Sequence, residues 1–144
     1  MSVFSADELE YLQSQTLGRI ATVGADGQPH VTPVTFIYDT EEDALDVGGV
    51  FFGDTKRWRD AHDNPKVTFL IDDVLSNPRR ARALEIRGMA ELRETGGDEI
   101  NPRFPNFAPE FFRIRPTWIV SWGLEEGGTD GSGFTTSSRA ASEL

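Results

Sequence analysis

The residues best suited to bind an anion lie in the segment GDTKRWRDAHDNPKVTFLIDD, residues 53–73. Asp54 or Thr55 can cap a short helix there, which places Lys56 and Arg57 in its first turn. Cations are disfavoured at this end of a helix, because the helix dipole is positive there. A basic first turn becomes favourable when an anion binds to the free backbone N–H groups and the side chains together. The alternative is that both cations are solvated surface charges.

The distribution of charge favours the anion. The chain of 144 residues has a net charge of −10, yet eight of its 14 Lys and Arg residues lie between Lys56 and Arg87, with five acids. That window therefore carries +3 and the remainder −13. A basic island in an acidic protein predicts a site for a small anionic ligand, because the acidic surround repels polyanions such as nucleic acid.

Residues that could perform catalysis themselves are few. The chain has no cysteine and only two histidines, His30 and His62, and its carboxylates show no spacing typical of metal ligands. It contains no Gly-x-Ser-x-Gly motif. No catalytic residue can therefore be named, and any enzyme chemistry is expected to belong to a bound cofactor. Without a signal peptide or an apolar run of about 20 residues, the chain is expected to be soluble and cytoplasmic.

The elements that must position these residues are mostly strands. A capping box, Ser5 with Glu8 three positions later, predicts a helix that ends near Gln15. Six strands are expected, at residues 18–23, 28–38, 44–50, 66–72, 83–92 and 111–122. Because no βαβ alternation is present, the predicted fold is mainly β, an antiparallel barrel with short helices at its rim.

Three segments are expected to lack regular structure, two within the folded domain and one after it. Residues 73–80 are expected to form a loop, and residues 94–109 an irregular segment with three prolines. The barrel domain is predicted to span residues 1–124. Residues 125–144 are rich in Gly, Ser, Thr and Ala without periodicity, which predicts a disordered C-terminal tail.

The run LGRIATVGADGQPHVTPV at residues 17–34, followed by TKR at 55–57 and NPKV at 64–67, resembles the pyridoxamine 5′-phosphate oxidase-like flavin/deazaflavin oxidoreductases. The closing run IRPTWIVSWG at 114–123 is similar to the actinobacterial branch that uses coenzyme F-420. The resemblance implies a six-stranded split β-barrel of the FMN-binding type. It also implies a homodimer with cofactor sites at the interface, and hydride transfer between coenzyme F-420 and an unknown conjugated small molecule.

The same resemblance implies which residues bind the cofactor. The cofactor phosphate would be held by Thr55, Lys56 and Arg57. The ring system would lie along the strand formed by His30, Thr32, Pro33, Val34, Thr35 and Phe36, facing its backbone amides. Trp122 of the partner subunit would complete the site. A basic loop would bind the anionic tail of coenzyme F-420 through Arg79, Arg80 and Arg82.

Two alternatives remain open at this point. The first is an FMN enzyme of the same fold, including an oxidase of pyridoxamine phosphate. The second is a non-enzymatic protein that binds a cofactor or haem, in which His30 or His62 would be the axial ligand. No nucleic-acid or membrane partner is expected.

Overall fold

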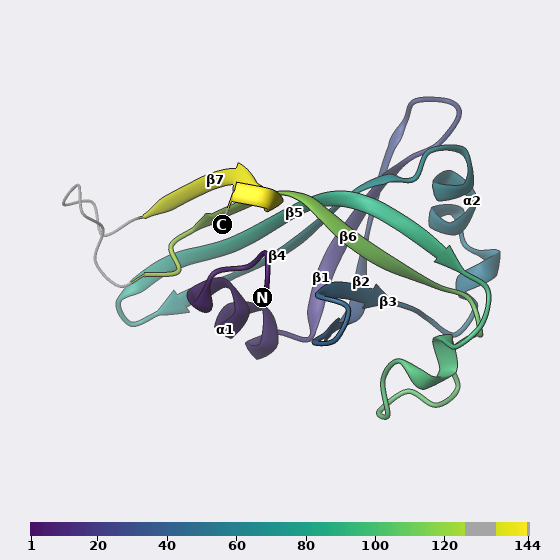
Figure 1. Cartoon of the computed structure of the whole chain (residues 1–144), viewed down its shortest axis with the longest axis horizontal. Helices are drawn as coiled ribbons and strands as arrows, with labels where there is room; N and C mark the ends of the chain where they lie inside the picture. Colours follow the sequence, from purple (N-terminus) through teal and green to yellow (C-terminus); the bar gives the residue numbers. More distant parts are fainter. Residues whose placement is uncertain (126–134, 144) are drawn as a thin grey trace.

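Figure 1 shows the computed structural model of the chain, which describes residues 1–125 and 135–143. The elements, in chain order, are α1 (Ala6–Ser14), β1 (Leu17–Val23), β2 (Pro29–Asp39), β3 (Ala44–Val47), η1 (Phe52–Asp54), α2 (Lys56–Asp63), β4 (Lys66–Ser76), β5 (Arg79–Arg93), η2 (Gly97–Glu99), β6 (Phe111–Trp122), β7 (Thr136–Ala140) and η3 (Ala141–Glu143). The fold is mainly β with short flanking helices, as predicted.

The strands form one antiparallel sheet in the order β3-β2-β1-β4-β5-β6-β7, and an additional pairing of β3 with β6 closes six of them into a barrel. The predicted six-stranded barrel is thus confirmed, and the described residues contain a seventh strand that was not predicted. The seventh strand, β7, lies outside the barrel and pairs with the far end of β6.

The split in the barrel comes from β6, which changes partners along its length. Residues 112–114 of β6 pair with β3, whereas residues 118–122 pair with β7. The β5–β6 register shifts between Arg87 and Gly88, which leaves Thr117 as the extra residue of a bulge. The Thr117 hydroxyl donates to the Arg87 carbonyl at 3.1 Å. One strand therefore belongs both to the barrel and to the extended arm beside it.

The barrel core is filled by alternate residues of each strand, because side chains in a strand point to opposite faces. Val34 and Phe36 of β2 point inward, and the Phe36 ring meets Phe69 of β4 edge-on, with centroids 5.0 Å apart. Their neighbours Pro33 and Thr35 consequently point outward. The largest fully buried side chains are Phe52, Phe69, Phe112, Leu12, Ile20, Leu45, Ile71, Leu84, Ile86, Ile114, Ile119 and Glu8.

The predicted capping box forms at α1. Glu8 N–H donates to Ser5 Oγ at 3.2 Å, and Ser5 N–H donates to Glu8 Oε1 at 2.9 Å. The Glu8 carboxylate is also held by Arg139 of β7, at 2.8 Å from Nη1 and 2.7 Å from Nη2. This strand corrects the prediction of a disordered tail from residue 125, because residues 136–140 are ordered by pairing with β6. Residues 126–134 and 144 lie outside the described residues.

No helix within residues 1–125 and 135–143 is long and apolar enough to cross a membrane.

Candidate cofactor site

The start of α2 combines a capped helix with two cations. Trp58 N–H donates to the hydroxyl of Thr55 at 3.3 Å, and this hydroxyl donates to the Phe52 carbonyl at 2.6 Å. Thr55 is therefore the N-cap, and its side chain is occupied. The first N–H groups of a helix have no intrahelical partner, so the backbone here adds donors to the two cations that follow.

Arg57 is the half-buried cation of this helix, and none of the described acidic residues forms an ion pair with it. Its guanidinium lies 4.9 Å from the centre of the Phe52 ring, next to the backbone of Gly49. Its Nε is buried, and no described residue accepts a hydrogen bond from it. Burial lowers the pKa of Arg57, because removal from water disfavours the charged form. A half-buried cation without an acid nearby is well suited to bind an anionic group.

Lys56 is held differently, by a buried carboxylate. Its Nζ lies 2.9 Å from Asp60 Oδ1, and the Thr22 hydroxyl donates to Asp60 Oδ2 at 2.9 Å. Gly24 leaves room for this carboxylate, because a Cβ there would lie 2.3 Å from Asp60 Oδ1. Thr22 pairs in register with His30, so the start of β2 and the start of α2 meet at Asp60. The Lys56 side chain stays 42% exposed, which leaves its amine open to a ligand.

Asp60 gives this cluster a pH dependence. Burial alone would raise the pKa of Asp60, but the hydrogen bonds from Lys56 and Thr22 outweigh it and hold that pKa below its ordinary value. A carboxyl group whose pKa is lowered by folding stabilises the protein above its unfolded pKa of about 3.9. This stabilisation is lost as the pH falls through the folded pKa.

The variant Asp60→Asn is expected to be less stable than the wild type at pH 7, because Lys56 loses its ion pair. Its stability should also fall less steeply between about pH 5 and pH 3. Urea unfolding at a series of pH values measures both effects. Asp63→Asn, at an exposed position at the end of the same helix, is the control. Parallel curves for the wild type and Asp60→Asn would contradict this assignment.

One edge of β2 is available to a ligand. β3 pairs only with residues 36–39 of β2, so residues 29–35 are paired with β1 on one side and with no described strand on the other. Their backbone groups on that edge can face a flat ring, and the position that the resemblance implies for the cofactor stays a prediction. The side chains of Val34 and Phe36 are buried in the core, and the Phe36 N–H already donates to the Thr16 carbonyl at 3.4 Å. Those of His30 and Thr32 are half-buried at the open end of the barrel.

The three other arginines and Trp122 lie elsewhere. Figure 1 shows α2 at one end of the long β4–β5 hairpin and the hairpin tip at the other. Ala90 of β5 marks the α2 end, because its N–H donates to the carbonyl of Pro65, which follows α2. Arg82 lies about 25 Å from Ala90 along β5 at the usual strand rise. Trp122 pairs with Ala83, so it lies beside Arg82. Within one subunit, the predicted site residues therefore lie in two groups at opposite ends of the molecule.

The predicted basic loop is also corrected, because Arg79, Arg80 and Arg82 are part of strand β5. Arg82 donates to Asp73, its partner across the hairpin, at 2.9 and 2.6 Å, and it stacks on Tyr11 with 4.7 Å to the ring centre. Its charge is therefore already balanced. Arg80 has a buried Nε that donates to no described residue. The two line a pocket of about 280 Å³ that is also lined by Asp7, Glu10, Tyr11, Ser14 and Leu124.

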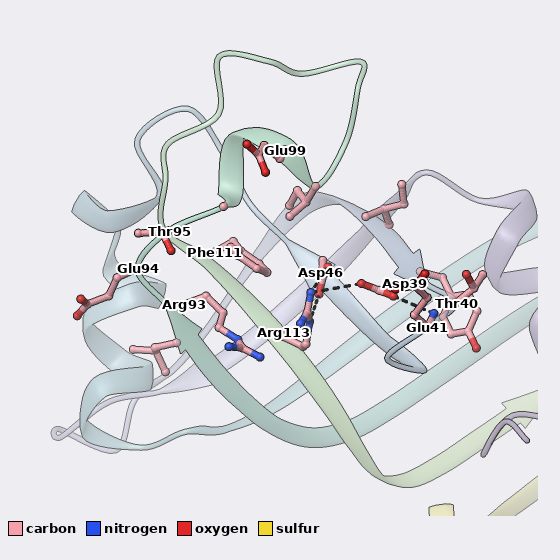
Figure 2. Close-up of a pocket in the computed structure, with 15 residues that line it drawn as sticks. Asp39, Thr40, Glu41, Asp46, Arg93, Glu94, Thr95, Glu99, Phe111 and Arg113 are labelled. Carbon is pink, nitrogen blue, oxygen red and sulfur yellow. Dashed lines mark hydrogen bonds and ion pairs between the residues drawn. The ribbon is translucent and has the colours of Figure 1, made fainter.

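A larger pocket, which the sequence does not predict, lies under the segment between β5 and β6 (Figure 2). We call it the loop pocket. Its volume is about 860 Å³, and its lining residues are Ile37, Tyr38, Asp39, Thr40, Glu41, Asp46, Leu92, Arg93, Glu94, Thr95, Gly96, Glu99, Ile100, Phe111 and Arg113. They come from β2, β3, β5, β6 and η2 and from the segments that adjoin these elements, so no short motif could have revealed the pocket.

An ion-pair cluster forms one wall of the loop pocket. Arg113 binds Asp46 through two hydrogen bonds of 3.0 and 3.1 Å and reaches Asp39 at 3.3 Å, as Figure 2 shows. Asp46 is 3% exposed. Burial raises the pKa of Asp46, and the hydrogen bond from Arg113 only partly opposes this. Arg113 is therefore a structural cation, because Asp46 and Asp39 already neutralise its charge.

Together these features define a class of protein. A closed antiparallel barrel, a strand shared with an outer arm, and a basic helix start beside an open strand edge describe a split-barrel protein. The family described as "Pyridoxamine 5'-phosphate oxidase" matches residues 5–123. The chain belongs to this family of oxidoreductases.

Three relatives were compared with the chain. A 5a,11a-dehydrotetracycline/5a,11a-dehydrooxytetracycline reductase from Streptomyces rimosus subsp. rimosus is 42% identical over 123 residues, covering 85% of this chain and 84% of the relative. The FAD binding protein from Mycobacterium smegmatis has a TM-score of 0.60 and 25% identity, covering 84% of this chain and 96% of that one. A heme binding protein from the same organism has a TM-score of 0.67 and 16% identity, covering 96% and 59%, and supports the fold alone.

Proposed function

We propose that this chain is a coenzyme F-420-dependent reductase of a conjugated small molecule. The observation that carries the proposal is Arg57, a half-buried cation at the start of α2, beside the open edge of β2, with no acid partner among the described residues. The reductase from Streptomyces rimosus supports the reaction class, since it is 42% identical over most of both chains. Bound coenzyme F-420 would supply a ring carbon that accepts or delivers a hydride.

The residues of the chain fit such a group in two places. Arg57 and Lys56, with the N–H groups of the α2 start, would hold a phosphate. The backbone edge at residues 29–35 would lie against the ring, with Pro33 and Thr35 presenting their side chains outward. The open edge of β2 and the Arg57 guanidinium are already in place before a ligand binds. The barrel would not need to rearrange, so binding would lose little free energy to reorganisation.

A homodimer accounts for the second group of predicted residues. Trp122 and Arg80 lie at the end of the molecule opposite to α2, so they could reach the same cofactor only from the partner subunit. Apolar side chains on the outer surface support a contact, because Val31 is 66% exposed and Leu17 is 46% exposed. In this arrangement Arg79 and Arg80 would bind the anionic tail of the cofactor. Arg82 would not, because Asp73 already balances its charge.

The reaction proposed for this site is the reduction of a carbon–carbon double bond conjugated to a carbonyl group. It requires a hydride at one carbon and a proton at the other, and the proton can come from water. The relative's name supports this class, because its substrates are dehydro compounds. A flavin is the second candidate cofactor, favoured by the FAD binding protein at 25% identity.

Titration of the protein with coenzyme F-420, followed by the fluorescence of the ligand, tests the proposal. We expect saturable binding with a Kd on the order of micromolar and one site per chain. FMN and FAD are titrated side by side under the same conditions. Tighter binding of a flavin would overturn the choice of coenzyme F-420, and binding of none of the three at about 100 µM would overturn the site itself.

A further inference from the structure

We propose that the loop pocket is the substrate site, and that it takes a ring system carrying both carbonyl-type oxygens and hydroxyl groups. This inference rests on the proposed function, because it assigns the substrate of the same reductase. It is supported by the position of the pocket, by its size and by the polar groups that line it.

The position of the pocket is next to the proposed cofactor ring. Ile37 lines the pocket and points to the same outer face of β2 as Thr35, about 7 Å away along the strand. The covering segment is tied to the cofactor side, since Ala108 N–H donates to the Gly49 carbonyl at 2.8 Å. Gly49 in turn lies against the guanidinium of Arg57. A molecule in the pocket would therefore extend toward a ring on the edge of β2.

The size and the lining of the pocket suit a small organic molecule. Its volume of about 860 Å³ lies within the range of small-molecule sites, roughly 300–1,000 Å³. The lining is mostly polar, and its apolar side chains are those of Ile37, Leu92, Ile100 and the buried Phe111. A few apolar groups within a polar lining suit a ring system that carries oxygen groups.

One donor in the pocket is available to a ligand. Arg93 has a buried Nε that donates to no described residue, and its ion pair with Glu91 is long, at 3.3 Å. Figure 2 shows the Arg93 guanidinium extending toward Arg113 and Asp46. Of the two arginines in the lining, Arg113 is already bound to Asp46 and Asp39. Arg93 is therefore the arginine that can bind an acceptor oxygen of the ligand. The Arg93 side chain is 42% exposed, so its terminal N–H groups can reach a ligand oxygen in the pocket.

The acids at the rim determine the rest of the chemistry. The lining includes five carboxylates and two arginines, a balance of −3. Glu41, Glu94 and Glu99 have no ion pair within the described chain, so they can accept hydrogen bonds from hydroxyl or amine groups. The same balance repels phosphates and directs the anionic cofactor to Arg57. The pocket therefore selects an uncharged or weakly cationic ligand rich in oxygen.

The test uses the full chain and oxytetracycline as the probe, because this compound carries ring hydroxyl and carbonyl oxygens and belongs to the class named for the relative. Binding is measured by isothermal titration with the wild type, Arg93→Leu and Glu99→Gln. Each variant is expected to bind the probe about tenfold to a hundredfold more weakly, as for one lost hydrogen bond to a charged group. Asp98→Asn is the matched control, since Asp98 is the exposed neighbour of Glu99 on η2 and does not line the pocket.

The outcomes separate this inference from the proposed function. Unchanged cofactor binding by Arg93→Leu and Glu99→Gln, together with weakened probe binding, supports the loop pocket. Probe binding that is absent at millimolar concentration, or equal in wild type and both variants, overturns it even if coenzyme F-420 binds. Conversely, weakened probe binding in both variants of a protein that binds no cofactor would support the pocket while overturning the proposed function.

Discussion

Replacing Arg57 with alanine is expected to weaken cofactor binding by about 10–100-fold, the effect of losing hydrogen bonds worth roughly 1.5–3 kcal/mol to a charged group. The stability of the cofactor-free protein should change little or rise slightly. Arg57 is half-buried without an acid partner, so removing it relieves an unfavourable burial of charge. Fluorescence titration and urea unfolding of the same preparations measure the two effects.

Arg59→Ala is the control for this prediction. Arg59 lies on the same helix, is exposed, and donates only to the Asp54 carbonyl among the described residues. Its removal lowers the net charge equally, so any general electrostatic effect on an anionic ligand appears in both variants. Equal losses of affinity in Arg57→Ala and Arg59→Ala would show that Arg57 makes no specific contact. The assignment of the α2 start as the phosphate site would then be wrong.

The variant Arg139→Met is expected to lower the free energy of unfolding by about 3–5 kcal/mol, because it leaves the buried Glu8 carboxylate without its cation. Burial raises the pKa of Glu8, but Arg139 and the Ser5 N–H outweigh it and hold that pKa below its ordinary value. The ion pair therefore stabilises the protein above about pH 4.3 and less as the pH falls through the folded pKa. The difference between wild type and variant should shrink in acid.

Thermal and urea unfolding at pH 7 and near pH 4 measure this effect. The matched control is Arg87→Met, which breaks the exposed pair of Arg87 with Glu85 and should change stability by less than about 1 kcal/mol. A loss of stability in Arg139→Met no larger than that of Arg87→Met would contradict the prediction. It would mean that β7 adds little to the stability of the barrel.

The sequence predicts the elements that depend on local chemistry. The capping box of α1 is specified by Ser5 and Glu8 alone, and the turn before β2 by Gly24 and Gly27, which bond at 3.1 Å. The barrel class follows from strand alternation and the absence of βαβ units. These features are predictable because the residues that cause them are neighbours in the chain.

The elements that the sequence misses depend on distant partners. The composition of β7 shows no strand pattern, and its order comes from pairing with β6 and from the Arg139–Glu8 ion pair across the chain. Local sequence alone predicts a free loop cation at Arg82, whereas the β4–β5 register places this residue opposite Asp73. Both errors have the same cause, since long-range pairing overrides weak local preferences.

The candidate site is predicted in part. The basic start of α2 is visible because the charges of Lys56 and Arg57 contradict the helix dipole. The sequence does not show that Asp60 engages Lys56 and leaves Arg57 unpaired, because this depends on where the barrel places Thr22 and Asp60. The sequence does not predict the loop pocket at all, because its lining residues are far apart in the chain and only the fold brings them together.

The open edge of β2 has a consequence for the solution behaviour of the protein. An unpaired strand edge can add a strand from another molecule and begin aggregation. Pro29 and Pro33 both lie on β2 and have no backbone N–H to donate. They limit how regularly a foreign strand could pair along the edge, while a flat ligand needs only a few of its groups. The two prolines thus allow the edge of β2 to stay unpaired when no ligand is bound, without favouring the addition of a strand from another molecule.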